Sequence, residues 1–445
     1  MLAIISFILL FTIYRLYPKY VLGIFFLISC SLPVDHNETS GIFSLKYFGY
    51  NFLYTDIFLS IIILDRIVDQ LLFREGANIF IIKNFKLKAS IFLFLIAVFI
   101  SVLIGFYSNF SANQIFYDTR PMLYFSIILF DFSQKKLKIT LTNLTILLFV
   151  GFALYSILAI SYLLLLDSHP FKIIFENSKL GRIVFHNEYL FLFIFPIIFI
   201  FINNKNISIK FRLLIFIFLL LFLSKLLVSM GRGMILFILI SLIMFMVLNL
   251  KSYKPSIKQI YLFLKFIFIA PFFVLLFTNY ILPFIWGEEY DTILTYYVSR
   301  FSNYEDSTFQ DTHVNNRFEM WYTGFREFFI SPIIGHGNGY YFSINSQEWD
   351  NKVSFVDSGM LTILIRLGLL GFIPFIFMMA IIIKSSFLRI NAATGNILLR
   401  KLHESYFNGI VVFFIYSFFN STIITSTAIL PFLILVIYIL KNEEI

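Results

Sequence analysis

The sequence predicts an all-helical protein that crosses a membrane many times. Of its 445 residues, 60% are apolar and only 13% are charged, and the mean hydropathy is +0.89. Soluble domains carry about 25% charged residues, so this composition excludes a water-soluble protein. Long, nearly uncharged runs such as 89–107, 234–250 and 261–283 approach the roughly 20 residues that a helix needs to cross a bilayer. They lack the alternation of a membrane β-barrel, which leaves a bundle of helices.

The N-terminal run 1–14 is interpreted as the first span rather than as a signal peptide, because it lacks a charged start and a small-residue cleavage site. A second run at 20–34 and a span at about 51–73 follow. The single cysteine, Cys30, excludes an internal disulfide framework and a multi-cysteine metal site. His186 and Glu188 do not predict a metal site either, because residues two apart point to different faces of a helix. No nucleic-acid motif is present.

Five basic clusters set the predicted topology, because Lys and Arg concentrate in short cytoplasmic loops. If all five face the cytoplasm, the chain crosses the membrane an even number of times between consecutive clusters. Hairpins are then expected at 89–132, 139–203 and 213–250, followed by a single span at 260–283. The clusters are Lys83/Lys86/Lys88, Lys135/Lys136/Lys138, Lys205/Lys210/Arg212, Lys251/Lys254/Lys258 and Lys384/Arg389/Arg400/Lys401.

The same topology places residues 284–356 outside the cytoplasm as one long loop. The chain re-enters the membrane near Asp357 and ends in a hairpin of two spans, about 404–419 and 424–440. We expect about 12 spans in total, with about 10 of them in an N-terminal bundle. The predicted regions are this bundle, residues 1–283, the outer loop, residues 284–356, and the C-terminal helices, residues 357–445. Cytoplasmic anchoring by Lys and Arg explains most of the net charge of +9.

Six arginines fall on the outer side in this topology, against the usual bias. An arginine near a helix end can snorkel to the interface, which is a purely structural explanation. Arg232 fits that explanation less well, because it lies in the tight turn "SMGRG" between two apolar spans. Several cations at one boundary favour an anion, and guanidinium groups bind phosphate in a bidentate manner. The hypothesis is a lipid-linked diphosphate held at the outer boundary. The six are Arg120, Arg182, Arg232, Arg300, Arg317 and Arg326.

The outer loop contains the stretch "NNRFEMWYTGFREFFISPIIGHGNGYY", residues 315–341. Its aromatic residues recur at spacings of three and four, which predicts an amphipathic helix in the membrane interface. Pro332 ends this helix. The turn "GHGNG", residues 335–339, can expose consecutive backbone N–H groups as an anion-binding nest, although such turns are more often simply turns. Gly335 and Gly337 are therefore candidate diphosphate ligands.

Asp357 stands where the chain re-enters the membrane. Two interpretations are open. Asp fills the N-cap of a helix well, and a carboxylate that faces the outer boundary can act as a general base. His336, His313 and Glu319 are the other candidates for the base.

The order of these features resembles the O-antigen polymerase and O-antigen ligase superfamily. Several spans precede a long outer loop, and "RFEMWYTGFREFFISPIIGHG" is similar to the loop signature of that family. "DSGMLTILIRLGLLGF" resembles the helix that follows the loop. "SMGRGMILFILI" and "GRIVFHNEYLF" resemble two arginine elements at earlier outer positions. The likeness is architectural over most of the chain and specific to motifs over these four segments.

The resemblance implies a metal-independent glycosyltransferase without a cofactor, in the bacterial inner membrane with its active face in the periplasm. Its donor would be an oligosaccharide linked to undecaprenyl diphosphate, and a chain-length regulator protein is a further candidate partner. An acceptor hydroxyl attacks the anomeric carbon and the lipid diphosphate leaves. By position, Arg232 and Arg317 would bind the diphosphate and offset the charge on the leaving group. Arg182 and Arg120 are weaker candidates for the same role.

One departure from the family pattern favours a polymerase of repeat units. Ligases of the superfamily have a His near the start of the helix after the loop, where this chain reads Val356-Asp357-Ser358. A ligase that transfers polymer to an acceptor stays the alternative. A flippase for the same lipid-linked sugars is the alternative of another class, and it should carry charges on both sides of the membrane in related halves. A non-catalytic assembly factor would need no arginine cluster at the outer boundary.

Overall fold

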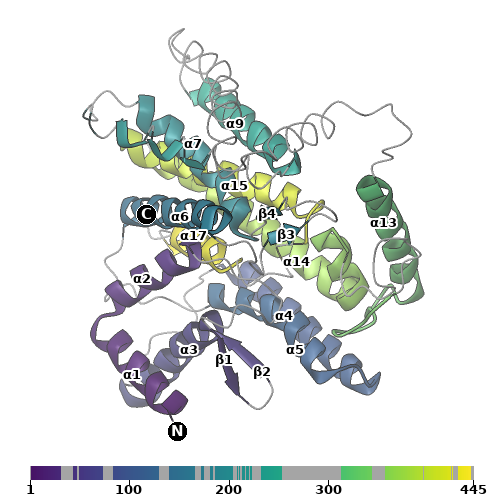
Figure 1. Ribbon diagram of the computed structural model, residues 1–445. Coiled ribbons are helices and arrows are strands. Elements are labelled where there is room, and N and C mark those ends of the chain that lie inside the picture. Colours follow the sequence, from purple (N-terminus) through teal and green to yellow (C-terminus); the bar gives the residue numbers. More distant parts are fainter. Residues whose placement is uncertain are drawn as a thin grey trace. The chain divides into compact units, whose positions relative to one another are not determined.

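The computed structural model is predominantly helical where it describes the chain (Figure 1). It divides into two compact units, and each is described separately: residues 1–151 with 316–445 form the first unit, and residues 152–315 form the second. The structure describes residues 2–31, 44–47, 50–73, 84–129, 140–165, 172–174, 181–183, 186–203, single positions and short pieces between 208 and 222, 232–252, 312–342, 356–421 except 394, 423 and 429–441.

The first unit begins with α1 (Leu2–Leu16) and α2 (Pro18–Ser31), which match the two predicted short runs. The two helices meet at a bend of 119°. Pro18 suits the first position of α2, because the N–H that it lacks would have no partner there. The strands β1 (Ser44–Tyr47) and β2 (Tyr50–Leu53) pair in antiparallel fashion before α3 (Tyr54–Phe73). Both strands carry the aromatic and apolar residues that fit a pleated surface.

The predicted hairpin at 89–132 consists of α4 (Phe85–Tyr107), α5 (Ala112–Leu123) and the 3₁₀ helix η1 (Tyr124–Leu129). Asn84 begins α4, and its side-chain oxygen accepts hydrogen bonds from two N–H groups of the first turn. The returning limb is not one regular helix. Pro121 lies inside α5, and the backbone changes to 3₁₀ form directly afterwards.

Between residues 141 and 252 the elements are α6 (Leu141–Leu165), β3 (Lys172–Ile174), β4 (Gly181–Ile183), the 3₁₀ helix η2 (His186–Leu190), α7 (Phe191–Asn203) and α9 (Arg232–Ser252). β3 and β4 form a second short antiparallel pair. α7 packs against α9 in the second unit, where the Ser241 hydroxyl donates to the Leu192 carbonyl at 2.9 Å. The strands of both pairs are only three or four residues long, so the described chain keeps its predominantly helical class, with two short strand pairs that the sequence did not predict.

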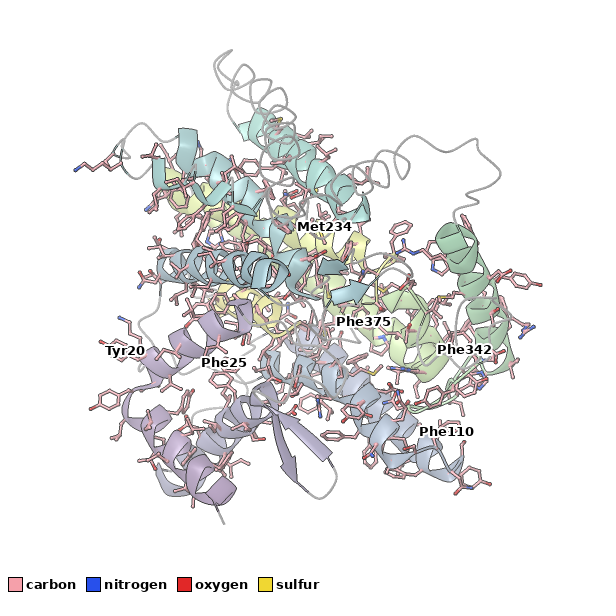
Figure 2. All side chains as sticks on the ribbon, in the orientation of Figure 1. Tyr20, Phe25, Phe110, Met234, Phe342 and Phe375 are labelled. Atoms are coloured by element: carbon pink, nitrogen blue, oxygen red, sulfur yellow. The ribbon has the colours of Figure 1, made fainter. Side chains whose placement is uncertain are left out.

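The C-terminal part contains α13 (Thr312–Ile330), α14 (Gly359–Ala392), α15 (Ile397–Tyr416) and α17 (Leu430–Lys441). α14 packs along α4 and along α15. Phe375 of α14, labelled in Figure 2, lies in this core, with its ring centroid 5.5 Å from Phe94 of α4 and 5.6 Å from Phe125 of η1. α15 and α17 correspond to the predicted final hairpin.

Two of the described helices, α4 and α14, are long and apolar enough to cross a membrane, and the bent pair α1–α2 is a third candidate. Shorter apolar helices lie at 141–157, 188–198, 236–248 and 430–440. This pattern agrees with a helical membrane protein, whereas the expected number of spans is not confirmed. The predicted span 260–283 and the loop residues 284–311 lie outside the described residues.

α14 is broken at Gly368, whose φ of 61° and ψ of −163° are not helical. A Cβ at this position would collide with the carbonyl of Ile333, so both the conformation and the space require glycine. Residues 359–367 form a buried first segment, and residues 369–392 form the apolar segment after the break. At 1.5 Å per residue the second segment is about 36 Å long, enough for a hydrocarbon core of about 30 Å.

Candidate functional site

The turn after α13 docks into the break of α14. Two N–H groups of the turn donate to carbonyls at the end of the first α14 segment, and two N–H groups of the second segment donate to carbonyls of the turn. Backbone groups that a helix break frees at membrane depth need partners inside the protein, and the turn supplies them. The donor–acceptor pairs are His336–Ile365, Gly337–Arg366, Leu369–Pro332 and Leu370–Ile333, at 2.8 to 3.1 Å.

This arrangement contradicts the predicted anion-binding nest. Each of the five N–H groups from Gly335 to Gly339 already donates within the protein. Gly335 and Gly337 are also buried, and a Cβ on Gly337 would lie 2.8 Å from the backbone nitrogen of Gly105. The glycines therefore allow close backbone packing, and their predicted role in diphosphate binding is not retained. The acceptors are the carbonyls of Ser331, Ile365, Arg366 and Ser101, and the carboxylate of Asp118.

A buried ion pair lies beside the docked turn. Arg366 Nη2 is 2.9 Å from Asp118 Oδ1, and the two side chains are 2% and 7% exposed. The other carboxylate oxygen of Asp118 accepts from the Gly339 N–H at 2.9 Å, and Gln114 donates to Oδ1 at 2.8 Å. The pair thereby connects α5, the turn and α14. Sequence reasoning missed Arg366, although a charge inside an apolar run is itself a signal.

Arg120 is buried as well, which contradicts its predicted contact with a diphosphate. Its Nε lies 3.4 Å from Asp56 Oδ2, and its guanidinium lies over the rings of Phe116 and Tyr117 at 4.6 and 5.2 Å. The Tyr124 hydroxyl donates to the other oxygen of Asp56 at 2.6 Å. Arg120 is 6% exposed. Because Asp56 and two rings already surround it, Arg120 links α5 to α3 rather than binding a substrate from outside.

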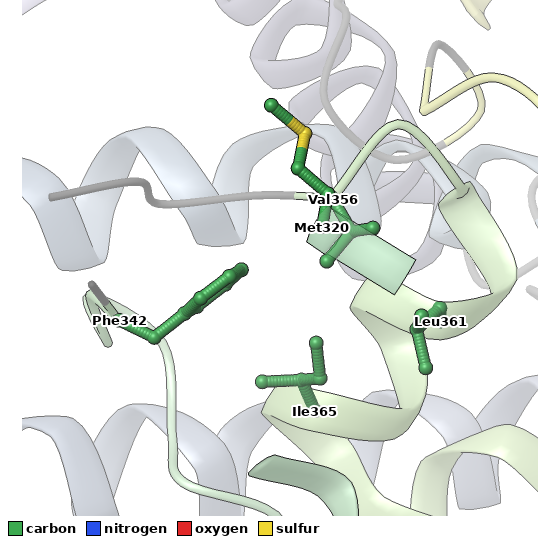
Figure 3. Packing of buried hydrophobic residues seen from close by; sticks show 5 residues of the cluster. All are labelled: Met320, Phe342, Val356, Leu361 and Ile365. Carbon is green, nitrogen blue, oxygen red and sulfur yellow. The ribbon is translucent and has the colours of Figure 1, made fainter. Parts of the chain in front are cut away.

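α13 is the amphipathic helix that the aromatic spacing predicts. Its inner face packs on the first segment of α14, and Gly324 makes this approach close, since a Cβ there would lie 2.9 Å from the Leu361 side chain. Burial of each large apolar side chain in such a cluster contributes about 1.5–3 kcal/mol, which fixes α13 against residues 359–367. The cluster consists of Met320, Phe342, Val356, Leu361 and Ile365 (Figure 3).

Two leading candidates, Arg317 and Asp357, meet at the start of these two helices. Arg317 Nε donates to Asp357 Oδ2 at 3.0 Å, across 40 positions of the chain. Their side chains are 60% and 35% exposed. Asp357 is not the N-cap of α14, because Ser358 caps it through a hydrogen bond from the Leu361 N–H. The Asp357 carboxylate is therefore available to a group that approaches from outside.

Arg317 retains hydrogen-bonding capacity for a ligand. Its Nε bond to Asp357 is the one hydrogen bond found for this guanidinium within the described residues, and the two Nη groups form a fork that suits phosphate oxygens. One turn later, Trp321 Nε1 is buried and finds no acceptor in the described part of the chain. A buried N–H without a partner costs about 1–3 kcal/mol. The Trp321 ring centroid lies 6.0 Å from Phe318 and 5.9 Å from Phe419.

His336, an alternative candidate for the base, is used to hold the turn. Its Nε2 lies 2.8 Å from the Glu327 carbonyl, and its ring stacks on Tyr340 at 4.2 Å between centroids. The Tyr340 hydroxyl donates to Glu327 Oε2 at 2.7 Å. Burial, and after it this hydrogen bond, raise the pKa of Tyr340 well above its ordinary value. These contacts attach the turn to α13 and favour a structural role for His336.

The other candidates are placed less completely. Arg182 lies in β4, Arg232 is the first residue of α9, and His313 lies in the first turn of α13, but their side chains are outside the described residues. Arg182 and Arg232 belong to the second unit, so their distance from Arg317 stays untested. Glu319 is exposed, and two positions along a helix place it about 200° around from Arg317. In the part of the chain that the structure covers, no three His, Cys, Asp or Glu side chains gather as metal ligands.

The fold and the site are those of a helical membrane protein in which α13 and the broken helix α14 present an open Arg–Asp pair. A family model described as O-antigen ligase matches residues 215–376, which include α9, α13, the docked turn and the first part of α14. This match confirms the resemblance to the O-antigen polymerase and ligase superfamily, and it does not distinguish a polymerase from a ligase. A search of the curated proteins found no match.

Proposed function

We propose that this chain polymerises undecaprenyl-diphosphate-linked oligosaccharide repeat units at the periplasmic face of the bacterial inner membrane, as a metal-independent glycosyltransferase. The observation that carries the proposal is the exposed pair of Arg317 and Asp357, 3.0 Å apart within the region that matches the family model. It joins a phosphate-binding cation to a proton acceptor, the two groups that this reaction needs.

Arg317 binds the diphosphate of the donor. Its Nη groups offer a planar fork to phosphate oxygens, and its permanent charge offsets the negative charge that develops as the sugar–phosphate bond breaks. Exposed ion pairs contribute only about 0–1 kcal/mol. The contact with Asp357 therefore separates at little cost when a diphosphate enters. Arg232 and Arg182 are proposed as further cations of this site.

Asp357 acts as the general base. Its carboxylate accepts the proton of an acceptor hydroxyl while the hydroxyl oxygen forms a bond to the anomeric carbon of the donor. The bond between that carbon and the diphosphate oxygen breaks, and the electron pair leaves with the lipid diphosphate. Because Ser358 caps α14, Asp357 is not held by the N–H groups of the helix and can approach the hydroxyl.

Glycan profiling of a deletion strain tests the function. We expect the strain complemented with Arg317→Ala to accumulate lipid-linked single repeats without long chains. Arg326→Ala is the matched control, and it should restore long chains, since Arg326 has a side chain 61% exposed but lies nine positions further along the same helix, on the opposite face from Arg317. Long chains at normal protein level in Arg317→Ala cells would contradict the proposal.

Other profiles would identify the alternatives. Long polymer that stays on the lipid carrier and never reaches its acceptor indicates a ligase. In that case a chain-length regulator protein would act on a different enzyme, the polymerase. Repeats trapped on the cytoplasmic side indicate a flippase. The polymerase is favoured over a ligase because this chain has Asp357 at the position where ligases of the superfamily have a His. It is favoured over a flippase because an exposed Arg–Asp pair suits a reaction and does not form a transport path.

A further inference from the structure

A groove of about 420 Å³ lies between α14 and α15, away from the proposed active site. Its walls are apolar apart from one charged residue, Lys384. The rings of Phe387 and Phe407, one from each helix, are 5.5 Å apart between centroids and join the two walls. The groove is lined by Ile376, Ala380, Ile383, Lys384 and Phe387 of α14 and by Phe407 and Phe414 of α15.

The groove runs along the apolar segment of α14. The α14 residues that line it are spaced by three and four positions, so they form one face of the helix. All of them follow the break at Gly368 and belong to the apolar segment that is long enough to span a membrane. A groove of several hundred Å³ can hold much of a small ligand, and along a helix that is long and apolar enough to span a membrane the available ligands are lipid chains.

Lys384 adds a charge that the described residues do not neutralise. No ion pair or hydrogen bond of Lys384 is found in the described part of the chain, whereas Arg400 pairs with Glu404 at 3.2 Å. Lys384 is exposed and lies about 12 Å of helix before Ala392, the last residue of α14. A cation on the flank of a span needs an anion or must reach the interface. Lys401 stands on the same basic end of the α14–α15 pair, which is the cytoplasmic end by the bias of Lys and Arg.

We propose that this groove binds an anionic glycerophospholipid of the cytoplasmic leaflet, with one acyl chain along the apolar walls and the phosphate against Lys384. Basic pockets between membrane helices on the cytoplasmic side recognise anionic head groups in this way. The charge complementarity selects an anionic lipid over a zwitterionic one. The proposal does not depend on the glycosyltransferase reaction, because Lys384 lies far along α14 from Asp357.

Native mass spectrometry of the full-length protein in detergent, titrated with phosphatidylglycerol or with phosphatidylcholine, tests the site. The native chain should retain phosphatidylglycerol preferentially. Lys384→Gln should reduce this preference about fivefold, since one Lys near a membrane surface contributes about 1 kcal/mol. Lys401→Gln is the control with the same change of charge outside the groove. Equal losses in both variants, or none in Lys384→Gln, would overturn the proposal.

A second variant tests the acyl chain separately from the charge. Ala380→Trp fills the groove and should lower retention of both lipids, while Ala392→Trp at the exposed end of α14 should leave retention unchanged. If Ala380→Trp retains phosphatidylglycerol as the native chain does, the groove is filled by another segment of the chain and does not bind lipid.

Discussion

Two Arg–Asp pairs in the first unit have nearly the same geometry and opposite surroundings. Arg366 lies 2.9 Å from Asp118 with side chains 2% and 7% exposed, and Arg317 lies 3.0 Å from Asp357 with side chains 60% and 35% exposed. The buried pair is surrounded by hydrogen bonds from the turn and α5, whereas the open pair is joined by one bond.

The difference separates an arginine that is enclosed by the fold from one that is accessible to a ligand. In a buried site the loss of one partner leaves a charge without compensation, which costs far more than the pair contributes. In an exposed site water replaces the partner, so the pair adds little to stability and either side chain can turn to a ligand. The position of an arginine in the predicted topology does not decide between these roles. Its exposure and its partners do.

The largest effect is expected for the buried pair. Arg366→Ala leaves the Asp118 carboxylate unpaired in the interior, and we expect it to destabilise the protein by about 3–5 kcal/mol. Unfolding in detergent, followed by tryptophan fluorescence, measures the loss. The double variant Arg366→Met with Asp118→Leu should recover most of it, because both charges are then removed. A single variant as stable as the native chain would show that the pair is not buried.

Asp357→Asn should affect catalysis and leave stability unchanged. The amide keeps the size of the side chain but accepts no proton, so we expect turnover of lipid-linked repeats to fall by about 10²–10⁴-fold. The unfolding midpoint should change by less than the equivalent of about 1 kcal/mol, because the pair is exposed. Undiminished turnover would remove Asp357 from the mechanism and place the base elsewhere in the outer loop.

Gly337→Ala should lower stability by about 1–3 kcal/mol, because φ is +90° and the added Cβ would meet the backbone of Gly105. Gly395→Ala is the control, since nothing lies within 4 Å of a Cβ there. Thermal unfolding of the two variants measures the difference. Weaker binding of a diphosphate lipid with an unchanged unfolding temperature would instead restore the anion-binding interpretation of the turn.

The smallest effect is expected at His336. His336→Gln removes the stacking on Tyr340 and alters the bond to the Glu327 carbonyl, which should cost about 1 kcal/mol. Turnover per folded molecule should stay within about twofold, because His336 is not the base in the proposed reaction. A loss of turnover as large as that of Asp357→Asn would indicate that His336, and not Asp357, is the general base.

Sequence patterns predicted those features of the structure that depend only on neighbouring residues in the chain. The aromatic spacing predicted α13, Pro332 marked its end, and the low charge predicted the membrane class. The two strand pairs were missed because short strands carry weak sequence signals beside long apolar runs. Arg317 and Asp357 were each candidates, but their pairing was not predicted, since no spacing in the sequence brings residues 40 positions apart together.

The break of α14 shows why the rest could not be predicted. "LIRLGLLGF" reads as one continuous apolar helix, and a single Gly inside such a run is usually tolerated. The hydrogen bonds that stabilise the break come from residues 332–337, more than 30 positions earlier. Because of the same distant contacts, Gly335 and Gly337 pack closely against other backbone segments and are no longer candidate ligands. The sequence pattern of one segment does not show which distant residues will form hydrogen bonds with it.

The discontinuity at Gly368 has a mechanical consequence. Only residues 369–392 have to match the thickness of the lipid, and they can tilt as that thickness changes. Residues 359–367 take their position from the turn and from α13, through backbone hydrogen bonds and a buried apolar cluster within the protein. The chain thus insulates the Arg317–Asp357 geometry from the bilayer, and membranes with longer or shorter acyl tails should leave the distance between these two side chains unchanged.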